Sequence, residues 1–124
     1  MDLEINILVV DDFQFARRIC INVLKEIGLK NIVEASSGNV ALDALSKKSF
    51  GLIITDHNMP GMSGIEFVRK VRADNNIKHI PIIMITSEGS KGTLLEATEA
   101  GVNGFLNKPF TKEDLTEKLN KILK

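Results

Sequence analysis

The stretch INILVVDD, residues 5–12, decides the fold of this chain. It contains a short run rich in Ile and Val, which favour β-strands, and two aspartates follow the run directly. We therefore predict a strand over Ile5–Val10 whose carboxyl end carries Asp11 and Asp12.

Similar apolar runs recur along the chain and alternate with helical patterns. Between the runs, apolar residues repeat at three- and four-residue steps, as they do on one face of a helix. The further predicted strands are 31–35, 52–55, 80–85 and 104–106. The predicted helices run from about Ala16 to a C-cap at Gly28, over 40–48, around 65–71, over 91–100, and from Thr111, where Asp114 completes a capping box. This alternation predicts an α/β fold, a parallel sheet with helices on both faces.

The spacing also predicts which helical side chains are buried. The first helix should bury one stripe, namely Ala16, Ile19, Cys20, Val23, Leu24 and Ile27, in which the single cysteine serves as a small apolar residue. The last helix should bury Leu115, Leu119, Ile122 and Leu123. Leu94 and Leu95 form the weakest stripe, so we expect the fourth helix to be marginal or mobile.

Composition and length exclude several classes of protein. The 124 residues, 44% hydrophobic and 26% charged, fit one domain over residues 1–124 and argue against disorder. The 16 basic and 16 acidic residues balance, so the chain lacks the basic excess of a nucleic-acid binder. It has no apolar run of the ~20 residues that a membrane helix needs, and it does not start like a signal peptide. We expect a cytoplasmic protein.

Polar side chains fall where the predicted strands end. Asp11, Asp12, Asp56 and Thr86 follow three strands, and Lys108 comes just after the fifth. An aspartate or threonine at one strand end is often a turn former or a helix cap. However, the carboxyl ends of parallel strands share one edge, where ligands of open α/β sheets bind. Because polar residues follow several strands, we favour a shared binding site over separate turn formers or helix caps.

The residue types at this edge suit phosphoryl chemistry. Carboxylates a few ångströms apart repel one another, which raises a pKa or requires a cation, and an all-oxygen set suits Mg²⁺. Lys108 adds a positive charge and Thr86 a hydroxyl. A carboxylate can then attack while the cations neutralise phosphoryl oxygens.

Four stretches resemble one known family across nearly the whole chain. They are LVVDD (8–12), IITDHNMPGMSG (53–64), PIIMITSEG (81–89) and LNKPF (106–110), and they are similar to response-regulator receiver domains. RRICINVLKEIG (17–28) and AGVNGFLNKPF (100–110) narrow the likeness to chemotaxis regulators of the CheY type. The resemblance implies a flavodoxin-like, CheY-like doubly wound sheet of five strands with the strand order 2-1-3-4-5.

The resemblance also implies a role for each matching residue. Asp56 is the phosphoacceptor, and Lys108, followed by a cis bond to Pro109, pairs with the phosphoryl group. The Mg²⁺ ligands are Asp11, Asp12, Asp56 and the backbone carbonyl of Asn58. Thr86 bonds a phosphoryl oxygen and moves together with the switch aromatic Phe105, while Asn58 and Glu88 tune the lifetime of the phosphate.

Two residues depart from the chemotaxis pattern. Phe105 replaces the usual tyrosine, so its ring can be buried without satisfying a hydroxyl, but it has no hydroxyl for a partner. His57 stands where the enteric protein has tryptophan, and we expect it to be an exposed loop residue.

The resemblance further implies the partners. These are a sensor histidine kinase of the CheA type, a flagellar motor switch protein of the FliM type and a phosphatase, acting on a monomer. Because the chain ends soon after the last predicted helix, we expect its output to be a protein contact. A phosphorelay intermediate, passing phosphate to a histidine phosphotransfer protein, is the nearest alternative.

Two other classes use a similar architecture. Metal-dependent phosphatases usually carry a second aspartate two residues after the nucleophile, where this chain has Asn58. A flavin carrier would need aromatic stacking partners, and the chain has no Tyr or Trp. Both are disfavoured, and we expect a phospho-accepting switch rather than an enzyme.

Overall fold

The computed structural model describes residues 1–87 and 89–123 and has the predicted alternation of strands and helices. The strands are β1 (Asn6–Val10), β2 (Asn31–Ala35), β3 (Leu52–Asp56), β4 (Ile82–Thr86) and β5 (Gly104–Asn107). The helices are α1 (Gln14–Ile27), α2 (Gly38–Lys47), α3 (Gly64–Ala73), α4 (Lys91–Ala100) and α5 (Lys112–Ile122). All strand pairs are parallel and the order is β2-β1-β3-β4-β5, which confirms the predicted fold class.

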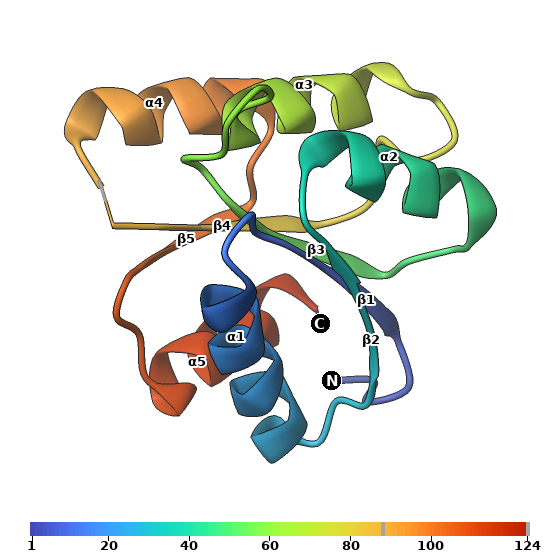
Figure 1. Cartoon of the computed structure of the whole chain (residues 1–124). Coiled ribbons are helices and arrows are strands. Elements are labelled where there is room, and N and C mark those ends of the chain that lie inside the picture. The colour runs from blue at the N-terminus through green and yellow to red at the C-terminus, as the bar shows by residue number, and fades with distance from the viewer. Residues whose placement is uncertain (88, 124) are drawn as a thin grey trace.

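The sheet separates two layers of helices. Helices α2, α3 and α4 cover one face, and α1 and α5 cover the other (Figure 1). Each face has its own apolar cluster, with Phe67 and Val68 of α3 in one and Leu24 and Leu115 in the other. The central strands β3 and β4 are buried on both faces, which explains their unbroken apolar runs.

Local chemistry sets the ends of several elements. Gly28 ends α1 in the left-handed conformation with φ 112°, which a glycine adopts without steric cost. Thr111 and Asp114 form the predicted capping box of α5. β4 begins two residues later than predicted, after Pro81, which has no N–H for the strand ladder.

Two predictions about buried side chains are wrong. Ile19 is 45% exposed, because it lines a surface groove beside Pro109 and Phe110 instead of packing under α5. Leu95 is 61% exposed, and Ala97 is the buried residue of α4. Ile122 and Leu123 are only partly buried, since α5 ends there. In the part of the chain that the structure describes, no helix is long and apolar enough to span a bilayer.

Candidate functional site

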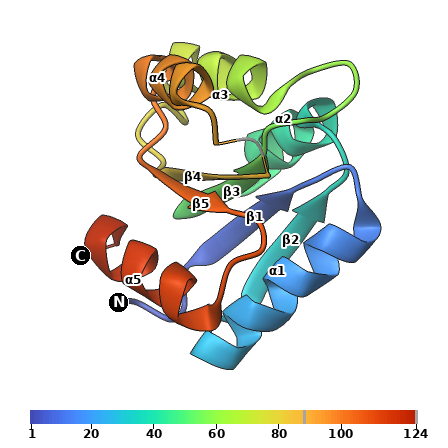
Figure 2. The same ribbon diagram turned by 90° about the vertical axis from the view of Figure 1, so that its left-hand side faces the viewer.

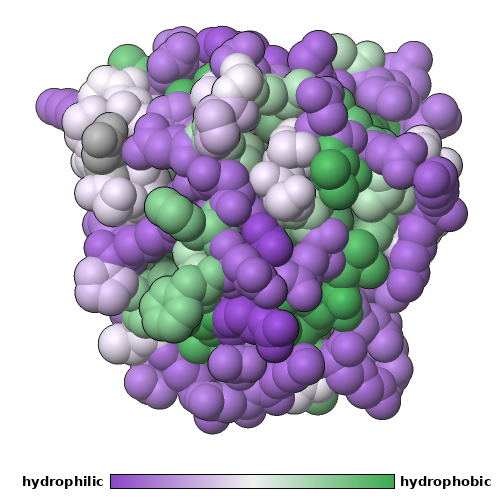
Figure 3. Space-filling model, viewed as in Figure 1, coloured by the Kyte–Doolittle hydropathy of each residue, from purple (hydrophilic) through white to green (hydrophobic). Residues whose placement is uncertain are grey.

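The parallel sheet brings the predicted polar residues to one edge. The carboxyl ends of the strands point towards the viewer in Figure 1 and to the right in Figure 2. Asp56 ends β3, Thr86 ends β4, and Asp11 follows β1. Register places Asp56 opposite Ile85 and Thr86 opposite Asn107, so these ends lie level with one another. Figure 3 shows this face as largely hydrophilic, with separate apolar areas.

Lys108 ties two of the aspartates together. Its Nζ donates to Asp11 Oδ2 at 3.1 Å and to Asp56 Oδ1 at 3.0 Å. The two carboxylates are mostly buried, with 8% and 11% of their side chains exposed. The backbone N–H of Lys108 donates to Thr86 O at 3.0 Å, which holds the lysine to the end of β4. The bond from Lys108 to Pro109 is cis, as expected.

Asp12 completes an oxygen-lined site. One carboxylate oxygen from each of Asp11, Asp12 and Asp56 lies within 4.8 Å of the others. Asp12 Oδ1 is buried and has no hydrogen-bond partner among the described residues. A buried carboxylate oxygen without a donor is costly unless a cation reaches it. Carboxylate oxygens also form the ligand set that a hard divalent ion prefers, so these residues fit Mg²⁺.

Burial shifts the pKa of Asp56, whereas contacts with carboxylates shift the pKa of Lys108. Burial raises the pKa of Asp56 above its ordinary value, and nearby Asp11 raises it further, while the hydrogen bond from Lys108 lowers it and does not prevail. For Lys108, burial lowers the pKa, but bonds to Asp56 and Asp11 outweigh it and the pKa is raised. Lys108 therefore stays charged, and the carboxylates carry more negative charge than one lysine neutralises.

The segment after β3 approaches α3 closely. The Gly64 N–H donates to the His57 carbonyl at 2.8 Å, and a Cβ on Gly64 would collide with the backbone carbonyl of Asp56. The glycine thus lets α3 begin directly beside the carboxylates. Asn58, two residues after Asp56, is exposed.

The remaining predicted residues lie in different environments. Phe105 is half-buried and packs against the apolar cluster on the α3 side of the sheet. Thr86 is 1% exposed. Glu88 lies outside the described residues. His57 corrects our prediction: it is half-buried, and its Nδ1 is buried without a hydrogen-bond partner among the described residues, because α3 packs against the loop that carries it.

Cys20 lies beside the site and is expected to be unreactive. It is 4% exposed and lines the same small cavity as Asp11, Asp56 and Lys108. Burial, with Asp11 as a second cause, raises the pKa of its thiol to about 12. A thiol that stays protonated is a poor nucleophile, so the prediction of a small apolar residue fits.

A small cavity lies beside the carboxylates. Its volume is about 20 Å³, enough for one water-sized occupant, and Asp11, Asp56 and Lys108 line it together with apolar side chains. Asp12 is not among the residues that line this cavity.

Sequence reasoning missed Arg17, which contacts the site from α1. Its Nη1 donates to the Asp11 carbonyl at 2.6 Å, and its Nε donates to Glu34 on β2 at 3.0 Å. An arginine five residues after an aspartate pair gives no local signal of this contact, because only the packing of α1 on the sheet edge creates it.

Comparison with known families agrees with this geometry. Residues 7–120 match the family described as the response regulator receiver domain. The strand order and the three carboxylates at the carboxyl edge define the class, and the chain belongs to the response regulator receiver domain family.

Its similar relatives include chemotaxis regulators of the CheY type. The chain is 47% identical over 122 residues to chemotaxis protein CheY-3 of Vibrio cholerae, which covers 98% of this chain and 94% of that protein. It is 48% identical over 116 residues to chemotaxis protein CheY of Pseudomonas aeruginosa, covering 94% of each.

Two solved structures share the fold closely. That of Vibrio cholerae CheY4 has a TM-score of 0.89 at 36% identity, over 96% of this chain and 98% of that one. The receiver domain of a Pseudomonas aeruginosa sensor histidine kinase, with magnesium coordinated in its active-site cleft, has a TM-score of 0.87 at 25% identity, over 97% and 98%.

Proposed function

We propose that this chain is a phospho-accepting switch of a two-component system, acting in the cytoplasm and most directly in chemotaxis. The observation that carries the proposal is the bridge that Lys108 makes between Asp11 and Asp56, beside the unpaired oxygen of Asp12. Asp56 is the acceptor because it alone ends the central strand β3 with Lys108 already bonded to its carboxylate.

The transfer follows from the positions of these side chains. A carboxylate oxygen of Asp56 attacks the phosphorus of a phosphohistidine on a sensor kinase. The P–N bond breaks, and the histidine nitrogen keeps the electron pair and takes up a proton. Lys108 balances the charge on the transferred group, and the Thr86 hydroxyl donates to one of its oxygens.

The metal would be held by the acidic residues of the edge. Its ligands would be Asp11, Asp12, Asp56 and the backbone carbonyl of Asn58. When bound, Mg²⁺ supplies positive charge that offsets the repulsion between the carboxylates and the phosphoryl oxygens. A magnesium-bound receiver domain among the similar structures supports this assignment.

The output is a change of surface on the side of α4, β5 and α5. Phosphorylation adds negative charge and acceptor oxygens that draw Thr86 and Lys108 towards the phosphate. Phe105, half-buried on β5, then packs further inward, and its ring needs no hydroxyl partner there. The partner is a flagellar motor switch protein, and Asn58 and Glu88 set how long the phosphate lasts.

Phosphotransfer tests the proposal directly. A histidine kinase labelled from ATP should pass label to the wild-type chain in Mg²⁺ and not to Asp56→Asn. Asp43→Asn is the matched control, because Asp43 is an exposed aspartate that pairs with Lys47 on the same helix. Label retained by Asp56→Asn would contradict the assignment of the acceptor.

A second experiment tests the output. The phosphorylated chain should bind a motor switch protein more tightly than the unphosphorylated chain. Equal affinity in both states, together with transfer of the label to a histidine phosphotransfer protein, would replace the motor output by a phosphorelay.

A further inference from the structure

Asp11, whose carbonyl begins the peptide that leads to Asp12, is held by three hydrogen bonds, and one of them is made to that carbonyl. The Asp11 N–H donates to Ala35 O at 3.1 Å, as the sheet continues past β1. Asp11 Oδ1 accepts from the Phe13 N–H at 3.0 Å, which closes the turn into α1. The Asp11 carbonyl accepts from Arg17 Nη1 at 2.6 Å. Backbone geometry supplies the first contact, and the third depends on one arginine side chain.

Arg17 is itself held in place from β2. Its Nε donates to Glu34 Oε1 at 3.0 Å, and only 13% of the Arg17 side chain is exposed. The planar guanidinium reaches a carbonyl and a carboxylate with different nitrogens, which a lysine ammonium cannot reproduce. The pair therefore spans from β2 to the end of β1.

This contact bears directly on the cation site. The Asp11 carbonyl belongs to the same planar peptide as the Asp12 nitrogen. Rotation of that peptide would turn the Cα–Cβ bond of Asp12, and with it the buried Oδ1 that lacks a partner. Repulsion among the carboxylates of Asp11, Asp12 and Asp56 pushes towards such a rotation, and the bond from Arg17 opposes it.

We infer that Arg17, oriented by Glu34, is a positioning residue that fixes the Asp11–Asp12 peptide so that both carboxylates face the divalent ion. The inference rests on the Mg²⁺ role proposed above. It assigns a function to an ion pair that otherwise counts as a surface contact between α1 and β2.

Whether Mg²⁺ affinity rises or falls when Arg17 is removed distinguishes a positioning role from a purely electrostatic one. Arg17 is a cation beside a cation site, so on Coulomb's law alone its removal should strengthen Mg²⁺ binding. A positioning role requires the opposite. Loss of a group that orients metal ligands typically weakens metal affinity by about 10- to 100-fold.

The experiment is a calorimetric titration of the purified, unphosphorylated chain with Mg²⁺ alone, at fixed ionic strength. Arg17→Met keeps the aliphatic stem and should weaken Mg²⁺ binding by about 10-fold or more. Arg18→Met is the matched control, since it removes an exposed positive charge from the next residue and should leave the affinity within twofold. Unchanged or tighter binding by Arg17→Met would overturn the inference.

A second variant keeps the test decisive if Arg17→Met does not fold. Glu34→Met leaves Arg17 in the chain but removes its anchor, and the charge-neutral pair Arg17→Met/Glu34→Met removes both. Positioning predicts weaker Mg²⁺ binding in each folded variant, and wild-type affinity in the folded variants would overturn it. If wild-type protein itself binds no Mg²⁺, the proposed metal role fails, whereas the Arg17 assignment fails only when wild-type binds and the variants match it.

Discussion

Two arginines anchor opposite ends of the strands and differ in what surrounds them. We call the side where the strands begin the amino edge, and the side where they end the carboxyl edge. At the amino edge, Arg72 of α3 makes five hydrogen bonds, to the carbonyls of Lys78, Ile80 and Gly101 and to the side chain of Asn103. At the carboxyl edge, Arg17 bonds one carbonyl and one carboxylate. Both connect elements that are distant in sequence.

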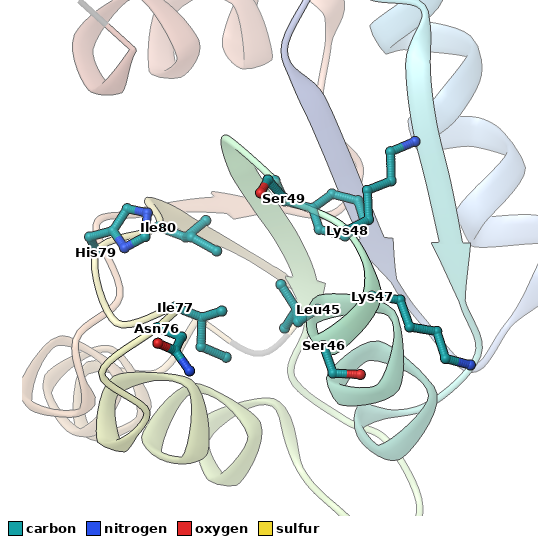
Figure 4. Close-up of a pocket in the computed structure, with 10 residues that line it drawn as sticks. Leu45, Ser46, Lys47, Lys48, Ser49, Asn76, Ile77, His79 and Ile80 are labelled. Atoms are coloured by element: carbon teal, nitrogen blue, oxygen red, sulfur yellow. The ribbon is translucent and has the colours of Figure 1, made fainter.

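The difference lies in which polar groups remain unpaired. Among the described residues, the buried side-chain atoms without a hydrogen-bond partner are Asp12 Oδ1 and His57 Nδ1, and both belong to the carboxyl edge. The amino edge has a hollow of about 310 Å³, and the side chains of Lys47 and Lys48 point away from it (Figure 4). A hollow of about 330 Å³ lies beside Asn107 and Pro109 at the carboxyl end of β5, so hollow size does not distinguish the two edges. The two edges therefore differ in their unpaired buried polar atoms and not in the size of their hollows.

Removing Arg72 should destabilise the amino edge and leave Mg²⁺ binding at the carboxyl edge unchanged. Arg72→Met leaves several partly buried carbonyls without their donor, so we expect the free energy of unfolding to fall by about 3 kcal/mol. Urea unfolding in EDTA measures this loss. Arg69→Met removes an exposed arginine from the same helix and should change stability by less than about 0.5 kcal/mol. A tenfold loss of Mg²⁺ affinity in Arg72→Met would show that the two edges are not independent.

Adding Mg²⁺ should stabilise the carboxyl edge. An ion that binds only the folded state, at 100 times its Kd, raises the free energy of unfolding by about 2.7 kcal/mol. Urea unfolding with and without Mg²⁺ gives this difference. Asp12→Asn should lose most of it, because the unpaired oxygen is then no longer a carboxylate oxygen. Equal stabilisation of wild type and variant would place the ion elsewhere.

The pH dependence of stability should reveal the strained carboxylate. Burial raises the pKa of Asp56 in the folded, Mg²⁺-free protein above the ordinary 3.8 of the unfolded chain. Between these two pKa values the folded state binds more protons, so this group makes the free energy of unfolding fall as pH rises through that window. The contribution of Lys108, whose pKa is raised above 10.5, is lost only at higher pH.

The Asp56→Asn variant should not show this fall in the free energy of unfolding with rising pH. Its slope of unfolding free energy against pH should differ from wild type by at most about 1.4 kcal/mol per pH unit. Urea titrations at stepped pH in EDTA give the slope, and Asp43→Asn, far from the site, should keep the wild-type slope. Identical slopes in wild type and Asp56→Asn would refute the raised pKa.

The smallest change in stability is expected from a substitution in the hollow at the amino edge. His79→Gln alters its exposed rim and should change stability by less than about 0.5 kcal/mol, with phosphotransfer and Mg²⁺ affinity unchanged. A kinase assay measures phosphotransfer, and calorimetry measures Mg²⁺ affinity. A clear loss of phosphotransfer or of Mg²⁺ affinity would mean that the amino edge also contributes to function.

Much of the fold and site could be predicted because the signals are local. Apolar runs gave the strands, and the Thr111–Asp114 capping box gave the start of α5. Periodicity was less reliable at helix faces: it assigned Ile19 and Leu95 inward, but a helical stripe does not state how far neighbouring elements extend over it. The strand order came from the family resemblance, not from any pattern in the residues.

By itself, the sequence determined that Asp11, Asp12, Asp56 and Lys108 would meet, because strand ends in a parallel sheet share one edge. Tertiary structure alone decided how they meet. It set the bonds of Lys108 to two carboxylates, the lone oxygen of Asp12 and the reach of Arg17 to a carbonyl six residues away. Such contacts depend on distances of a few tenths of an ångström between packed elements, and residue order does not encode those distances locally.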